Sequence, residues 1–145
     1  MDSYSLILII HLLCAIFFIG FIFTDIFVFP ILSKKFSKTE VQNIKASIGE
    51  RGIKIFPLMV LVLLITGTMM FSKYINAEVG YFQSTFQYLL WLKVFLVLII
   101  ASGIVYSLFC KVTKRVPVAF MSHFHKYVFV LTVLIVIIAK LMFVV

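Results

Sequence analysis

The sequence has few charged residues. Only 12% of its 145 residues are charged, and five of them are acidic, whereas about 25% is usual for soluble proteins. It also contains no Ser-His-Asp, paired-carboxylate, P-loop or CxxC arrangement, so hydrolase and nucleotide chemistry are unsupported. Of its two cysteines, Cys14 and Cys110 are expected near opposite faces of a membrane. They are then too far apart to form a disulfide.

Apolar residues take the place of the missing charge. The chain is 64% hydrophobic, with 17 phenylalanines and a mean hydropathy of +1.24. These residues form four runs, each near the length of about 20 residues that crosses a bilayer. We therefore expect a multi-pass membrane protein with lipid as its main partner, folded as a single all-α domain over residues 1–145. The predicted spans cover residues 5–30, 53–74, 86–109 and 127–145.

Basic residues orient these spans. Lysines and arginines cluster in the loops after the first and third spans, and the positive-inside rule places such loops in the cytoplasm. Both termini and the loop containing Glu78 then face outward, into the periplasm if the protein lies in a bacterial inner membrane. Short connections predict an up-down-up-down four-helix bundle. The net charge of +8 is explained by this orientation and by anionic lipid, so nucleic-acid binding is not expected.

The segment between the first two spans has helix signals. Ser37 and Glu40 have the spacing of a capping box. We expect a short surface helix, or a cytosolic extension of the second span, interrupted near Gly49 and Gly52. Pro57 is expected in the first turns of that span, where its missing N–H costs little.

Polar and sulfur-containing side chains recur at one depth of the predicted bundle. With a rise of about 1.5 Å per residue, His11, Lys93 and Lys140 each lie roughly 8–10 Å below the outer end of their span. Met69 and Met70 lie at a similar level. Two buried ammonium groups without a nearby acid favour an anionic ligand. A b-type haem meets this description, with His11 binding the iron and the two lysines near the propionates.

Each of these residues also has a simpler interpretation. His11 can hydrogen-bond a carbonyl or hydroxyl of another helix, and Lys93 and Lys140 can extend toward the outer interface. Met69 and Met70 can serve only for packing. If haem binds, Met69, Met70, Lys93 or a vacant position remain open as the second axial position.

One face of the first span is expected to look into the bundle. Residues His11, Cys14, Phe18, Phe21 and Asp25 recur at spacings of three and four. Asp25 lies about 20 Å from His11 along this face and is expected to pair with a cytoplasmic-side cation such as Arg51 or Lys54. Two further histidines, His123 and His125, are expected at the inner membrane edge, facing solvent.

Several short motifs resemble those of the HemJ and CopD group, membrane proteins that include HemJ-type protoporphyrinogen oxidases and copper-resistance D domains. They are Ile10-His11-Leu12-Leu13, Phe56-Pro57-Leu58-Met59, Leu64-Ile65-Thr66-Gly67, Trp91-Leu92-Lys93 and Ala139-Lys140. The resemblance implies haem binding, with His11 as an axial ligand and Lys93 and Lys140 near the porphyrin.

The chain also departs from the HemJ-type enzymes. Thr24-Asp25-Ile26-Phe27 stands where those enzymes carry a Pro-Arg pair, and His123-Phe124-His125 stands where they carry an acidic residue beside a proline. A further histidine of the third span is missing. These differences concern protoporphyrinogen oxidation and leave the haem site unaffected.

Three functions follow as hypotheses. The first is an inner-membrane haem b protein, an oxidoreductase that exchanges electrons with a quinone or a porphyrinogen. The second is copper binding or transport, in which His11, Cys14, Met69 and Met70 act as ligands suited to Cu(I). The third is a cofactor-free subunit of a larger membrane complex. The large lipid-facing surface would also allow a homodimer.

Overall fold

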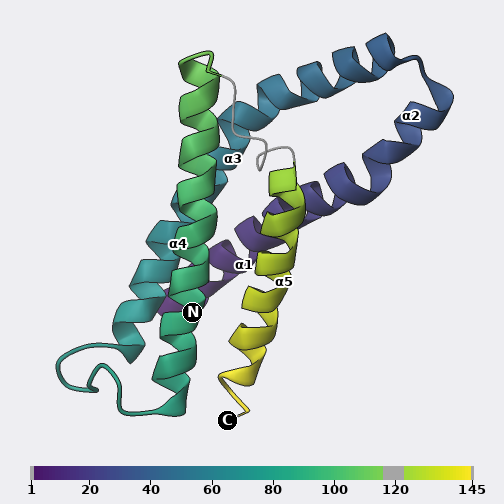
Figure 1. The fold of residues 1–145 in the computed structure, drawn as a ribbon. Coiled ribbons are helices and arrows are strands. Elements are labelled where there is room, and N and C mark those ends of the chain that lie inside the picture. Colours follow the sequence, from purple (N-terminus) through teal and green to yellow (C-terminus); the bar gives the residue numbers. More distant parts are fainter. Residues whose placement is uncertain (1, 116–122, 145) are drawn as a thin grey trace.

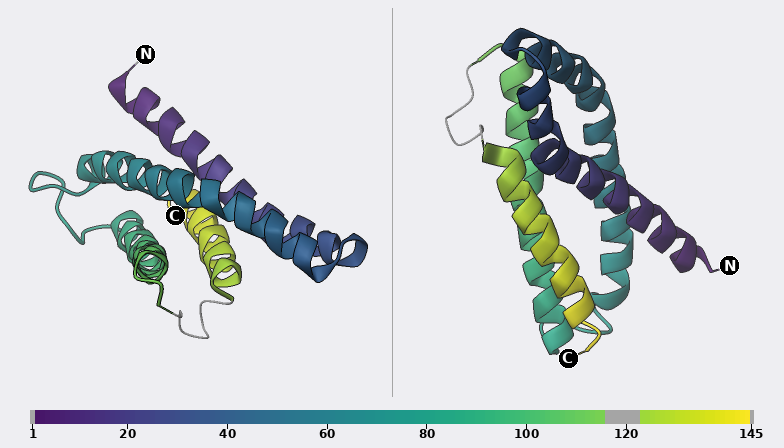
Figure 2. Two further views of the ribbon diagram at one scale, coloured as in Figure 1. Left: turned by 90° about the horizontal axis from the view of Figure 1, so that it is seen from above. Right: turned by 90° about the vertical axis from the view of Figure 1, so that its right-hand side faces the viewer.

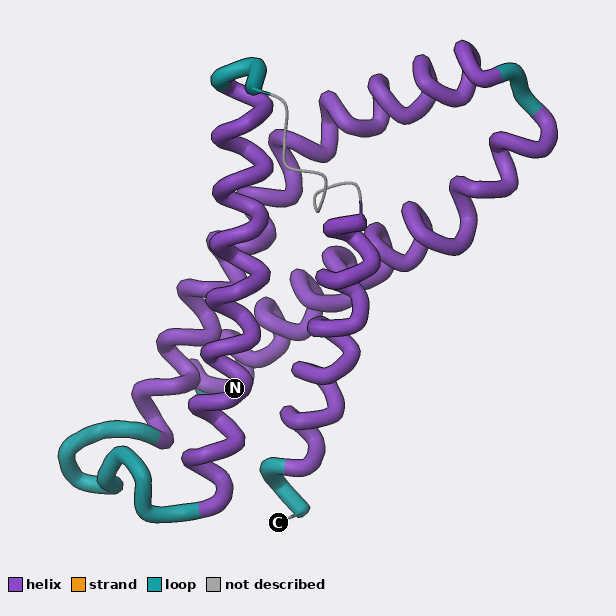
Figure 3. Tube along the Cα trace, viewed as in Figure 1, coloured by secondary structure: helices purple, strands orange, loops and turns teal. Residues whose placement is uncertain are grey.

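The computed structural model describes residues 2–115 and 123–144, and nearly all of them are helical (Figures 1 and 3). The helices are α1 (Ser3–Phe23), α2 (Leu32–Lys35), α3 (Lys38–Tyr74), α4 (Thr85–Val112) and α5 (Phe124–Leu141), with two irregular turns between α1 and α2. Four helical segments are long and apolar enough to cross a membrane. The predicted all-α four-helix bundle is confirmed. The predicted end of the fourth span at Val145 lies outside the described residues.

The ends of the chain and the loops lie as an up-down-up-down path requires. The first turn of α1 reaches the end of α3, where Tyr4 and Tyr74 bond, and the end of α5 lies at the same end of the molecule as the loop between α3 and α4 (Figure 1). We call this the outer end, and the opposite end, which carries the basic segments, the inner end. Helix α1 packs mainly against α3 and also against α5, while α4 packs against α5. Figure 2 shows that α1 crosses the other helices at a steep angle.

The first span continues beyond Pro30. A π-helical turn, η1 (Thr24–Val28), and a 3-10 turn, η2 (Phe29–Ile31), lead into α2. Pro30 has no N–H to donate to the preceding turn, and the Phe29 N–H bonds to the Thr24 carbonyl, five residues back. Such π-helical turns inside α-helices occur frequently at functional sites. Asp25 lies within this one.

Helix α3 is continuous over 37 residues. Its predicted capping box is confirmed: the Glu40 N–H donates to the Ser37 hydroxyl at 3.3 Å, and the Ser37 N–H donates to the Glu40 carboxylate at 2.8 Å. The predicted interruption near Gly49 and Gly52 is wrong. Pro57 consequently lies in the helix interior rather than in a first turn, and α3 bends between its two halves (Figure 1), as an interior proline requires.

Few of the described side chains are buried, and most of the buried apolar ones form two clusters. Phe18, Ile22, Ile100 and Val128 pack together toward the inner end, and Ile75, Leu90 and Met142 pack at the outer end. Most other large apolar side chains are exposed on the helix surfaces. Hydrocarbon is the medium that suits such a surface.

The outer loop, residues 75–84, is held by side chains of α4. Gln87, only 2% exposed, donates from Nε2 to the carbonyls of Tyr74 and Gly80 at 3.1 and 2.9 Å, and its Oε1 accepts from the Gln83 N–H at 2.7 Å. The Trp91 indole donates to the Tyr81 carbonyl at 3.1 Å. Gly80 has a φ of +85°, a conformation that favours glycine. The outer end is thus closed by a hydrogen-bonded loop.

Candidate functional site

His11 is half-buried in α1, and its imidazole binds a hydroxyl of α3. Its Nδ1 lies 2.8 Å from the Thr66 Oγ, and Thr66 is 7% exposed. The same hydroxyl lies 2.7 Å from the Val62 carbonyl oxygen, which can only accept. Because the hydroxyl has a single proton and donates it to Val62, Nδ1 of His11 carries a proton and donates to Thr66. The lone pair of the neutral imidazole is then on Nε2, the nitrogen left to bind a metal.

Two further residues affect the surroundings of His11, Gly67 by contact and Lys93 by its charge. A Cβ placed on Gly67 would be 3.4 Å from His11 Cε1, so the absence of a side chain lets the imidazole lie against α3. Lys93 is half-buried in α4 and close enough to His11 for their charges to interact. The structure therefore places Thr66 and Gly67 of α3 in contact with His11, and Lys93 of α4 within electrostatic range of it.

The other predicted ligand-binding residues are placed less centrally. Met70 is half-buried and follows Thr66 by one turn on the same face of α3, whereas Met69 is 52% exposed. Lys140, in the last turn of α5, is exposed. Both cysteines are free, and Cys14 lies one turn after His11. Among the described residues, no three His, Cys, Asp or Glu side chains lie close enough together to hold a metal ion.

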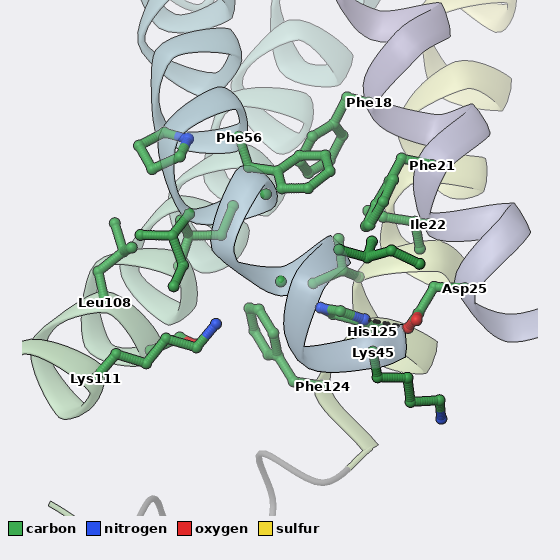
Figure 4. Close-up of a pocket in the computed structure, with 18 of the residues that line it drawn as sticks. Phe18, Phe21, Ile22, Asp25, Lys45, Phe56, Leu108, Lys111, Phe124 and His125 are labelled. Atoms are coloured by element: carbon green, nitrogen blue, oxygen red, sulfur yellow. Dashed lines mark hydrogen bonds and ion pairs between the residues drawn. The ribbon is translucent and has the colours of Figure 1, made fainter. Parts of the chain in front are cut away.

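At the inner end the inward face of α1 lines a pocket of about 200 Å³. Its walls come from α1, α3, α4 and α5 and include Phe18, Phe21, Phe56 and Phe124 (Figure 4). The prediction that Phe18, Phe21 and Asp25 face the bundle is confirmed, since all three line this pocket. The pocket was not predicted from the sequence.

Asp25 pairs with a histidine of α5. Its Oδ2 lies 2.5 Å from Nδ1 of His125, which corrects the expected pairing with Arg51 or Lys54. The reason is the orientation of α3, which turns its glycine-containing face toward the pocket and leaves Arg51 and Lys54 exposed on the other side. His125 is 51% exposed, so its position at the inner edge agrees with the prediction, but it also has a specific partner.

The sequence alone did not identify Thr66 as the partner of His11, nor Gln87 as the residue that holds the outer loop. Thr66 is next to the glycine of a recognised motif, but only the crossing of α1 over α3 identifies it as the partner of His11. Gln87 follows the helix-capping Ser84 by three residues, a spacing that indicates a helix start and gives no sign of the loop that it holds.

These observations define the class: an all-α, multi-pass membrane protein with a half-buried histidine that bonds a threonine of another helix, and with a separate pocket at the basic end. Comparisons of the chain with protein-family models, curated proteins and solved structures found no match.

Proposed function

We propose that this protein is a membrane-embedded, b-type haem-binding redox protein in which His11 is an axial ligand of the iron. The observation that carries the proposal is the hydrogen-bond chain from His11 Nδ1 through the Thr66 hydroxyl to the Val62 carbonyl. A metal-binding histidine typically donates its second ring N–H to a fixed acceptor, which selects the tautomer and orients the ring. His11 has such an acceptor.

The simpler interpretation of His11, a histidine bonded to a hydroxyl of another helix, describes the same contact. The two interpretations are compatible because that contact uses only Nδ1. The nearby charge of Lys93 favours the haem, since a half-buried ammonium group is stabilised by an anionic propionate. Gly67 supplies a surface without a side chain beside the imidazole.

The residues around His11 also indicate what the protein contributes. When bound, haem exchanges single electrons, and the protein tunes its potential through the axial ligand, hydrogen bonding and burial. His11 supplies the ligand, Thr66 orients it, and Lys93 supplies positive charge. Because the site lies within helices that can cross a membrane, the electron donor or acceptor is a membrane-soluble molecule, a quinone or a porphyrinogen, in a bacterial inner membrane.

The visible absorption spectrum of the detergent-purified protein tests this function. We expect a Soret band that shifts on reduction by dithionite, and its loss in His11→Ala. His123→Ala is the matched control, because His123 lies at the opposite end of the bundle and should leave the band unchanged. A colourless wild-type protein after expression with added haem precursor would refute the proposal.

A further inference from the structure

The inner-end pocket has no part in the proposed haem site, yet it combines a polar pair with aromatic walls. His11 and Asp25 are 14 residues apart along the first span, about 20 Å at the rise of a helix, so the two sites are separate. The Phe21 and Phe56 ring centroids are 4.1 Å apart, and the Phe18 and Phe56 centroids 6.3 Å apart. These rings form an apolar wall suited to a flat molecule.

Absent side chains leave space on the α3 side of the pocket. Gly49 and Gly52 line it, and a Cβ on Gly52 would come within 2.9 Å of the Phe56 ring. Any larger residue there would force that ring to shift. The pocket volume of about 200 Å³ is below the usual range for drug-sized ligands and corresponds to one or two fused six-membered rings. A longer ligand must extend out of it.

Two polar groups reach the pocket from different helices. Figure 4 shows His125 with one ring nitrogen on Asp25 and the other directed away from it, and Lys111 extending toward the pocket from α4. Lys45 also lines the pocket but extends away from its centre (Figure 4). Because Nδ1 of His125 is held by the carboxylate, Nε2 remains for a ligand, as a donor when the ring is protonated.

We propose that this pocket binds the headgroup of a quinone. A para-quinone is a flat ring with carbonyl acceptors at opposite edges, which fits an aromatic wall with a donor on each side, His125 Nε2 and Lys111 Nζ. The apolar tail of the quinone would leave the pocket between helices. This inference takes from the proposed function only the expectation of a quinone partner, and it requires no haem.

An anionic lipid headgroup is the main competitor for the same site. Two observations favour the quinone. The Asp25 carboxylate lines the pocket and partly compensates the positive charge of its lysines, and five phenylalanines line the space that a hydrated phosphate would have to occupy. A neutral carbonyl needs one donor and tolerates both features.

Photoaffinity labelling tests the proposal. The full-length protein in phosphatidylcholine nanodiscs is irradiated with an azido-naphthoquinone, with and without excess menadione, and the adducts are mapped by mass spectrometry. We expect menadione-protected adducts in residues 18–29 and 104–111. Their yield should fall about tenfold in His125→Ala, as for loss of one hydrogen bond from a partly desolvated site, and by a smaller factor in Lys111→Met.

Matched variants separate binding from folding. His123→Ala and Lys114→Met change the same residue types outside the pocket lining and should label as the wild type does. His11→Ala removes the proposed haem ligand and should also be labelled as the wild type is. The labelling result can therefore be interpreted even if the haem proposal is refuted. The quinone site would be overturned if menadione protected no adduct, or if His125→Ala were labelled as strongly as the wild type. It would also be overturned if phosphatidylglycerol displaced the probe from the wild type but not from Lys111→Met.

Discussion

The two ends of this bundle use their polar residues in opposite ways. At the outer end, polar side chains bind one another or the backbone: the Tyr4 and Tyr74 hydroxyls lie 3.1 Å apart, and Gln87 holds the outer loop. At the inner end, the Asp25–His125 pair is partly exposed and borders a pocket. A fixed metal ligand requires a closed, preorganised setting, whereas an exchanging ligand needs access. The contrast is consistent with our two proposals, a resident cofactor toward the outer end and an exchanging ligand at the inner end.

The largest expected effect comes from opening the outer end. Gln87→Ala removes a side chain with three hydrogen bonds to Tyr74, Gly80 and Gln83. It should lower the free energy of unfolding by about 3 kcal/mol, because buried carbonyls and an N–H lose their partners. Chemical denaturation in detergent measures this, with Gln42→Ala, at an exposed position of α3, as the control. Equal stabilities of the two variants would show that the loop is not held by this residue.

Removing the acceptor of His11 should weaken the cofactor site next. Thr66→Val keeps the shape of the side chain but leaves the Nδ1–H of His11 without its hydroxyl. Haem affinity should fall about tenfold, the lower range for loss of a group that orients a metal ligand. Haem titration of the apoprotein measures it. Thr68→Val is the matched control, because the Thr68 hydroxyl bonds the Leu64 carbonyl at 2.7 Å in the same helix. A drop of similar size in that control would contradict the assignment.

A smaller effect is expected at the inner end. Asp25→Asn replaces the carboxylate that pairs with His125, and both side chains are partly exposed at 27% and 51%. The loss of stability should be about 1 kcal/mol or less and should shrink at high salt. Denaturation at two salt concentrations measures it, with Glu50→Gln on the exposed face of α3 as the control. A loss of stability as large as that of Gln87→Ala would contradict the proposed difference between the two ends.

The smallest effect should come from Gly67→Ala. A methyl group there lies 3.4 Å from His11 Cε1, so the gain in helix propensity of about 1 kcal/mol is offset by contact with the imidazole. Gly20→Ala has nothing within 4 Å and should show the full gain. Thermal unfolding of both variants compares them. A greater stabilisation by Gly67→Ala would show that the imidazole does not lie against this glycine.

The sequence predicts that this protein is helical and where its spans lie. It predicts the contacts between the helices less well. Hydropathy locates four spans, and the Ser37–Glu40 spacing correctly predicts the start of α3. Helix periodicity also predicts which face of α1 looks inward. The interruption at Gly49 and Gly52 was predicted wrongly because glycine lowers helix propensity only modestly, and the packing of the helix outweighs that cost.

Contacts between helices depend on crossing angles and bends, which the sequence does not give directly. Counting residues assigns His11 and Lys93 to one depth, and Lys93 is within electrostatic range of His11. The partners of His11 and Asp25 could not be predicted in this way, because a bent α3 and a π-helical turn determine which residues of α3 and α5 face α1. The inner pocket arises from the same irregularities.

The visible spectrum of the purified protein, compared between wild type, His11→Ala and Thr66→Val, tests the central claim most directly. The account predicts a Soret band in the wild type, a weaker one at equal haem in Thr66→Val, and none in His11→Ala. A band of undiminished strength in His11→Ala would contradict it, because the iron would then be bound elsewhere.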